Sequence, residues 1–166
     1  IFICTKSITF NTFLNSQAEF LKKKGFNVEV ACSDVENLNL KNIQTYKINF
    51  PTKFTHLFNI FRYIKVLIQL LSIIKKNKKS IFYLHTPVAS YLFRIFSFFH
   101  NLKIIYFVHG FRFTSDTSFF ISFFYKILEK VLNLKSKIFI TINSEDYSYV
   151  KNNLFKKVPV YKIKGV

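Results

Sequence analysis

The chain has few of the residues on which several kinds of functional site depend. Its 166 residues include no Met, no Trp, 3 Gly and 2 Cys. Gly25, Gly110 and Gly165 are too widely spaced for a glycine-rich nucleotide loop, and the sequence contains no GxGxxG, GxxxxGK[ST], GxSxG or HExxH motif. Cys4 and Cys32 lack CxxC or Cys/His spacing, which indicates two small buried residues in a reducing cytosol and neither a zinc site nor a disulfide framework.

Acidic residues are also scarce. Asp and Glu number 8 against 25 Lys and Arg, so the formal net charge is +17. Such a charge favours an anionic partner such as nucleic acid, a membrane surface or a phosphorylated substrate. The abundance of Phe, Ile, Asn and Lys is equally typical of an AT-rich coding sequence, and both explanations stay open. Most aromatic residues have the spacing of a hydrophobic core, which argues against nucleic-acid binding.

The sequence contains no long uncharged apolar run. Its most apolar region, Leu57 to Ile74, is interrupted by Arg62 and Lys65, and a bilayer-spanning helix needs roughly 18 to 20 apolar residues. Ile1 to Thr5 is too short for the apolar region of a signal peptide. Because the chain begins on a predicted strand without Met, we expect it to be a fragment forming one domain over residues 1–166.

Short apolar segments alternate with helical patterns along the whole chain. We predict strands at Ile1–Thr5, Asn27–Cys32, Thr45–Phe50, Ile81–His85, Ile104–His109, Ile138–Ile142 and Val160–Ile163. The predicted helices lie near Asn11–Lys24, Leu57–Lys76, Val88–Phe99 and Phe119–Leu134. This alternation predicts an α/β fold with an open, doubly wound parallel sheet, whose ligands bind beyond the carboxyl ends of the strands.

The first candidate site segment is His85-Thr86-Pro87, at the end of a predicted strand. Thr86 suits the N-cap of the next helix and Pro87 its first position, so the free N–H groups of that helix would face a phosphate or a sugar hydroxyl. The alternative is that Thr86 and Pro87 only start a helix.

The second candidate segment, His109 to Phe113, follows the most apolar strand. His109 can donate or accept a hydrogen bond near neutral pH, Gly110 allows a tight turn, and Arg112 can pair with phosphate. The third segment begins at Asn143, a suitable N-cap, with Glu145 and Asp146 in the first helical turn, where the helix dipole alone explains acidic residues.

Several segments in order resemble the acceptor-side domain of family 4 glycosyltransferases, particularly those that build capsule, O-antigen or glycan-lipid precursors. They are LKKKGFNVEVACS, YLHTPVAS, IIYFVHGFRF, a helical EK pair, ITINSEDY and KIKGV. The resemblance implies a GT-B fold of two Rossmann-like domains and sugar transfer with retention of configuration from a nucleotide-sugar, without a metal or other cofactor. It also implies a glycan or polyprenyl-diphosphate-linked acceptor, and a cytoplasmic protein at the inner face of the plasma membrane.

The resemblance also assigns site residues. His109 corresponds to the histidine that approaches the donor sugar, and Gly110 and Phe111 shape its turn. The remaining substrate-binding candidates are Thr5, Lys6, Ser7, His85, Thr86, Arg112, Asn143 and Glu145. The helical pair Glu129 and Lys130 is expected to be structural.

Two features depart from the family pattern. Thr5 to Thr9 replaces the glycines that admit donor phosphates in many relatives, and the nucleotide-sugar domain with its paired glutamates would follow Val166. We therefore expect no turnover from this chain alone. Two further hypotheses are docking of the basic helix Leu57–Lys76 and the patch Lys75–Lys79 on an anionic membrane, and a non-enzymatic α/β module that binds an anionic partner. A helix that merely packs on the sheet is the alternative to docking.

Overall fold

The computed structural model describes residues 1–40, 42–51, 60–113 and 117–164. In this part of the chain, seven strands form one parallel sheet in the order β3-β2-β1-β4-β5-β6-β7. The strands are β1 (Phe2–Ile3), β2 (Glu29–Cys32), β3 (Gln44–Lys47), β4 (Ile81–Leu84), β5 (Lys103–Val108), β6 (Ile138–Thr141) and β7 (Val160–Lys162). The helical elements are α1 (Ser7–Thr9), η1 (Phe10–Leu14), α2 (Asn15–Lys23), η2 (Val35–Asn37), α3 (Ile60–Lys76), α4 (Pro87–Phe96), α5 (Phe119–Leu132), η3 (Asn133–Lys135) and α6 (Ser144–Asn153).

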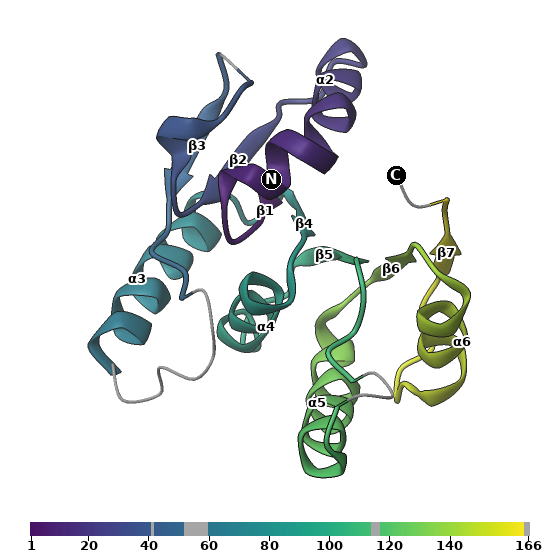
Figure 1. The fold of residues 1–166 in the computed structure, drawn as a ribbon. Helices are drawn as coiled ribbons and strands as arrows, with labels where there is room; N and C mark the ends of the chain where they lie inside the picture. Colours follow the sequence, from purple (N-terminus) through teal and green to yellow (C-terminus); the bar gives the residue numbers. More distant parts are fainter. Residues whose placement is uncertain (41, 52–59, 114–116, 165–166) are drawn as a thin grey trace.

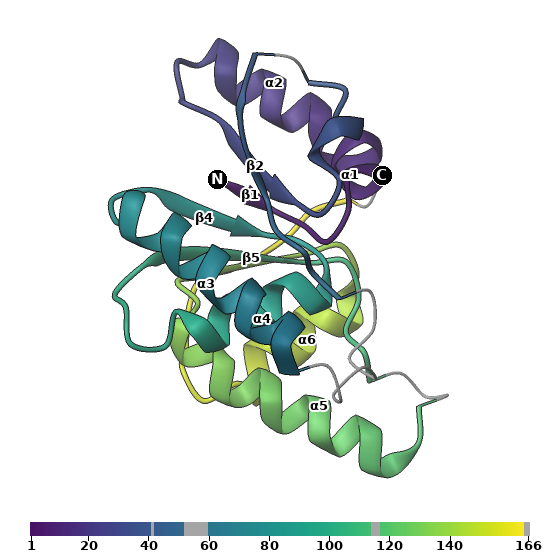
Figure 2. The same ribbon diagram turned by 90° about the vertical axis from the view of Figure 1, so that its left-hand side faces the viewer.

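Helices cover both faces of the sheet, which confirms the predicted doubly wound α/β architecture. Figure 2 shows α1 and α2 on one face and α3, α4, α5 and α6 on the other. The strand order runs outward from β1 to β3 and then returns to β4 on the other side of β1. The switch point therefore lies between β1 and β4, where the loops that follow the two strands diverge and leave room for a ligand.

Two groups of buried side chains stabilise the sheet, one on each face. The larger includes Phe82, Phe93, Tyr106 and Phe139 and lies under α3, α4 and α6, whereas the smaller, with Phe10, packs under η1 and α2. Cys4 and Cys32 are both buried and form no disulfide, as expected. None of the helices in the described ranges is long and apolar enough to cross a membrane.

The first helical segment starts earlier than the predicted residue, Asn11. It begins at Ser7 and continues through the π-helical η1 into α2. The reason is a long-range contact, because the Asp34 carboxylate after β2 accepts hydrogen bonds from the Ser7 N–H (2.7 Å) and hydroxyl (2.8 Å). At the other end, Gly25 has the expected left-handed backbone, with φ +85°.

The orientation of α3 differs from the prediction. Val66, Leu70, Ile73 and Ile74 face the core, whereas much of the predicted apolar stripe is exposed, namely Ile60, Phe61, Ile64 and Ile68. The helix is apolar on two sides, so its periodicity could not decide which side packs on the sheet. The predicted start of this helix at Leu57 lies outside the described residues.

A buried ion pair joins α4 to α5. The Arg94 guanidinium donates to both oxygens of the Glu129 carboxylate, at 2.9 and 3.2 Å, and both side chains are fully buried. The guanidinium carbon also lies 4.1 Å from the centre of the Tyr106 ring. Because a charge inside the protein is tolerated only when it is paired, this contact fixes the two helices relative to each other. Glu129 is therefore structural, as expected.

Candidate functional site

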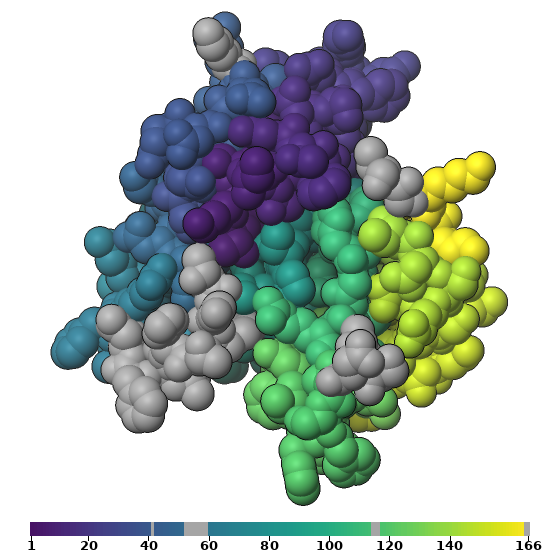
Figure 3. Space-filling model, viewed as in Figure 1, coloured from purple at the N-terminus to yellow at the C-terminus, as the bar shows by residue number. Residues whose placement is uncertain are grey.

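Two adjoining pockets lie at the carboxyl ends of β1, β4 and β5, beside the switch point. Thr9, Thr86 and Pro87 line both of them. The first has a volume of about 430 Å³ and is otherwise lined by Phe13, Phe107, His109, Ile142, Ile163 and Lys164. The second has a volume of about 330 Å³ and adds Thr5, Lys6, Ile8, Val88 and Arg112. Figure 3 looks onto this edge, where the surface is hollowed between the purple start of the chain and the green end of β5.

His109 and His85 form a contacting pair at this edge. Nε2 of His109 lies 3.1 Å from Nδ1 of His85, a hydrogen-bond distance. His109 is half-buried and lines the first pocket, whereas His85 is fully buried among the rings of Phe2, Tyr83 and Phe107. The expectation that His85 binds substrate is therefore wrong for direct contact, because its ring lies behind His109.

The surroundings of the pair favour the neutral form of both rings. Burial, together with the neighbouring His109, lowers the pKa of His85 well below its usual range, and burial also lowers the pKa of His109. Between two neutral rings, one nitrogen donates and the other accepts. Nε2 of His85 has no hydrogen-bond partner among the described residues. The contact with His85 therefore fixes which nitrogen of His109 carries hydrogen.

Thr86 holds a strained backbone at the boundary between the two pockets. Its φ is 63° and its ψ is 134°, a combination that β-branched residues rarely adopt. The predicted N-cap hydrogen bond is not formed, since the Thr86 hydroxyl instead accepts from the Thr5 N–H at 3.0 Å and lies 2.7 Å from the Thr5 hydroxyl. Thr5 and Thr86 thus tie β1 to β4 across the switch point, and Pro87 starts α4 as predicted.

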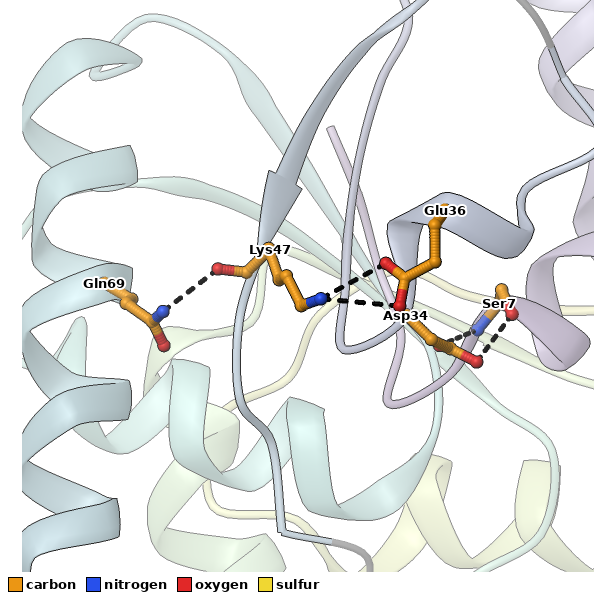
Figure 4. A network of polar contacts seen from close by, with 5 residues as sticks. All are labelled: Ser7, Asp34, Glu36, Lys47 and Gln69. Carbon is orange, nitrogen blue, oxygen red and sulfur yellow. Dashed lines mark hydrogen bonds and ion pairs between the residues drawn. The ribbon is translucent and has the colours of Figure 1, made fainter.

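Ser7 supports the site without reaching a ligand through its side chain. It is buried, and its hydroxyl and N–H both bind Asp34, as Figure 4 shows. Although burial raises the pKa of Asp34, the hydrogen bonds from Ser7 lower it overall. This carboxylate already accepts the Ser7 N–H at the start of α1, so that N–H is not available to an anionic ligand. Lys6, by contrast, is exposed and lines the second pocket.

The same figure shows how the loop after β2 is connected to the rest of the sheet. Nζ of Lys47 on β3 lies 3.3 Å from the Glu36 carboxylate on η2, and Nε2 of Gln69 on α3 donates to the Lys47 carbonyl oxygen at 3.1 Å. The segment that carries Asp34 is therefore held from both sides.

The turn after His109 divides its residues between the core and the pocket. Gly110 has φ +138°, which a residue with a side chain rarely adopts. Phe111 is buried and stacks on Phe113 with 4.8 Å between ring centres, so its predicted role in substrate binding is wrong for the side chain. Arg112 is exposed and lines the second pocket, as a phosphate-binding residue would.

The third predicted segment caps a helix. The Asn143 side chain accepts from the Asp146 N–H at 2.7 Å and donates to the Asp146 carboxylate at 2.7 Å, which confirms the N-cap. Burial raises the pKa of Asp146, although hydrogen bonds from Asn143 and from the Phe111 N–H oppose the shift. Asn143 and Glu145 are exposed, but neither belongs to the lining of the two pockets.

Sequence reasoning missed several residues of the first pocket. Phe13 lies in the π-helical η1, inside the predicted helix, and no local pattern indicated that its side chain reaches the pocket. Ile142, Ile163 and Lys164 follow the two last strands, and only the parallel order of the sheet brings them beside His109. Strand ends in general were the signal that could have found them.

The fold matches one half of the GT-B fold, as a comparison with solved structures shows. A sucrose-phosphate synthase chain from Thermosynechococcus elongatus superposes with a TM-score of 0.66 at 11% identity, over 99% of this chain and 87% of that chain. MurG from Acinetobacter baumannii gives 0.63 at 11% identity, over 99% of this chain and 45% of that one. A glycosyltransferase from Rickettsia africae gives 0.66 at 17% identity, over 98% and 41%. This chain thus spans less than half the length of the last two.

The sequence itself identifies the family. Residues 3–143 match the family described as Glycosyl transferase 4-like, and the chain belongs to it. No curated protein matches the sequence.

Proposed function

We propose that this chain is the acceptor-side half of a retaining glycosyltransferase that moves a sugar from a nucleotide-sugar to a lipid-linked glycan in surface polysaccharide synthesis. The observation that carries the proposal is His109, which lines a pocket at the switch point and is backed by the buried His85. Membership of the glycosyl transferase 4-like family supports the reaction class.

The charges around the pockets suit an anionic donor. Lys6 and Arg112 line the second pocket and Lys164 the first, while no Asp or Glu belongs to either lining among the described residues. These cations would attract a nucleoside diphosphate and stabilise the charge that develops on it as it leaves. No metal is required in this scheme.

His109 would act as a hydrogen-bond partner for the donor sugar. A buried N–H without an acceptor is unfavourable, so His85 best carries its hydrogen on Nδ1 and donates it to Nε2 of His109. His109 then carries hydrogen on Nδ1 and presents a neutral donor to a sugar hydroxyl. We propose His85 as the residue that positions His109, and no longer as a substrate ligand.

A two-domain protein tests the proposal. We expect no sugar transfer from the chain alone, because half a cleft neither holds the diphosphate nor excludes water. Joining it to the nucleotide-sugar domain of a family member should produce transfer to a polyprenyl-diphosphate acceptor. In that protein, His109→Ala should lower kcat about 100-fold or more. His100→Ala, a histidine between α4 and β5 at the other edge of the sheet, is the matched control. Full activity of His109→Ala would contradict the assigned role.

A further inference from the structure

The start of α5 exposes a group of large apolar side chains. The exposed fractions are 76% for Phe119, 82% for Phe120, 52% for Ile121, 55% for Phe123 and 61% for Phe124. The start of the helix projects from the body of the molecule (Figures 1 and 3). These five side chains contribute little to the core, and such a concentration of exposed apolar surface marks an interaction site.

The outer face of α3 has the same character. Ile60, Phe61, Ile64 and Ile68 are between 46% and 80% exposed. α4 packs against both α3 and α5, and all three helices lie on one face of the sheet (Figure 2). The apolar faces of α3 and α5 therefore flank α4 on the same side of the molecule.

Both apolar surfaces begin at the edge that carries the pockets. In a parallel α/β sheet, each crossover helix runs back against the strands, so its first turn lies near the carboxyl edge. Phe119 and Ile60 start their helices at that edge, as Figure 2 shows for α3 and α5. His109 lines a pocket at the same edge.

Among the described residues, the charged side chains beside these surfaces are positive. Lys65 on α3 and Lys126 on α5 are exposed, as is Arg112 before α5. α3 contains no acidic residue, and Glu129, the one acid in the α5 sequence, is buried against Arg94. Exposed Phe and Ile beside Lys and Arg are the combination that binds an anionic membrane surface.

We infer that the outer face of α3 and the start of α5 insert into an anionic lipid bilayer, which brings the His109 edge close to the membrane. At about 100° per residue, the five apolar residues at the start of α5 cover more than half of the helix circumference. A protein groove contacts one stripe of a helix, whereas lipid surrounds an inserted end. This inference deepens the proposed function. It rests on that function in one respect, namely that the acceptor is held in the membrane.

This orientation differs from docking through Lys75 to Lys79. Lys75 and Lys76 lie in the last turn of α3, and Lys78 and Lys79 precede β4, so the patch lies at the amino edge of the sheet. A membrane bound there would face away from His109. The two orientations can be separated by experiment.

Single tryptophans give a direct test, because the chain contains none. In Phe120→Trp, vesicles of phosphatidylglycerol and phosphatidylcholine with brominated chains should quench the fluorescence and shift it to shorter wavelength. The matched control is Phe99→Trp, since Phe99 is 95% exposed and follows α4 at the amino edge. Quenching of Phe99→Trp alone, or of both equally, would overturn the inference.

Vesicle sedimentation tests the same surface with unlabelled protein. The chain should bind anionic vesicles more strongly than phosphatidylcholine alone, and Phe120→Ser/Phe123→Ser should lower partitioning about ten-fold or more. Both side chains are exposed, so the variant should keep the unfolding midpoint. Lys78→Gln/Lys79→Gln should retain binding within about two-fold.

A different outcome would contradict the inference. If the chain does not bind vesicles but forms a dimer through α5 that Phe120→Ser/Phe123→Ser abolishes, the inference is wrong. Transfer to a soluble acceptor in the two-domain protein would still test the proposed function.

Discussion

Replacing His85 by Phe should reverse the order of stability between neutral and acidic pH. The ring of His85 is fully buried and its pKa is lowered by burial and by His109, so the folded chain does not protonate it. The unfolded chain does so below about pH 6.5. The neutral ring of His85 therefore contributes its full share to the free energy of unfolding above that pH. This share is lost as pH falls below it. From about pH 7.5 to about pH 5, this loss is about 2 kcal/mol.

His85→Phe keeps the aromatic packing against Phe2 and Phe107 but removes the hydrogen bond to His109. At about pH 7.5, the variant should be about 1 kcal/mol less stable than wild type. At about pH 5 it should be about 1 kcal/mol more stable, because it lacks the proton uptake of His85 on unfolding.

Urea unfolding at both pH values measures this change. Tyr83→Phe is the matched control, since burial raises the pKa of Tyr83 to about 12 and its hydroxyl does not titrate in this range. It should lower stability equally at both pH values. If His85→Phe kept the pH dependence of wild type, the buried neutral state of His85 would be refuted.

Other variants test the supports of the fold and the site. Glu129→Gln should lower the free energy of unfolding in urea by about 3 to 5 kcal/mol, because it leaves the buried charge of Arg94 without a partner. The double variant Arg94→Met/Glu129→Leu removes both charges and should lower it less. Equal losses in the two variants would contradict this account. Thr86→Val and Thr86→Gly both lose the hydroxyl, but only Val keeps a β-branched side chain at the positive φ. Thr86→Val should therefore be less stable than Thr86→Gly by about 1 to 3 kcal/mol in urea unfolding, and the opposite order would exclude backbone strain. Asp34→Asn should cost about 1 kcal/mol near neutral pH through weaker bonds to Ser7. Because the folded pKa of Asp34 is lowered, that difference should shrink as pH falls below 3.8, and a constant difference would count against it.

The sequence was sufficient for the architecture because parallel strands buried on both faces are short, apolar and separated by helical patterns. β5 and β6 follow this rule closely and were predicted with small shifts at their ends. The orientation of α3 could not be predicted, since a helix with two apolar sides has no unique buried face. The early start of α1 depends on Asp34, which lies 27 residues further along the chain than Ser7.

For the site, strand ends located His109, Thr86 and Arg112 correctly at one edge. The strand ends could not show which side chain faces the pocket. How deeply a side chain at a strand end is buried depends on the neighbouring strands, which the local sequence does not specify. His85 pairs with His109 inside the sheet, and Phe111 turns into the core under α6. Residue type and position therefore predicted the edge at which the two pockets lie, but not which side chains line them.

Two populations of cations in the chain have different causes. Lys22 and Lys23, Lys75 and Lys76, and Lys151 lie in the last turns of α2, α3 and α6, where cations stabilise the negative end of the helix dipole. These five of the 25 Lys and Arg residues are explained without any partner, so they do not support a non-enzymatic module that binds anions through its overall charge. Lys6, Arg112 and Lys164 have no such explanation, since they surround the pockets at the opposite edge of the sheet. A charge-driven module would bind any polyanion through both populations, whereas a transferase half needs only the cations at the pockets. The position of these few cations, more than the total charge, therefore supports the proposal that this edge binds a nucleoside diphosphate.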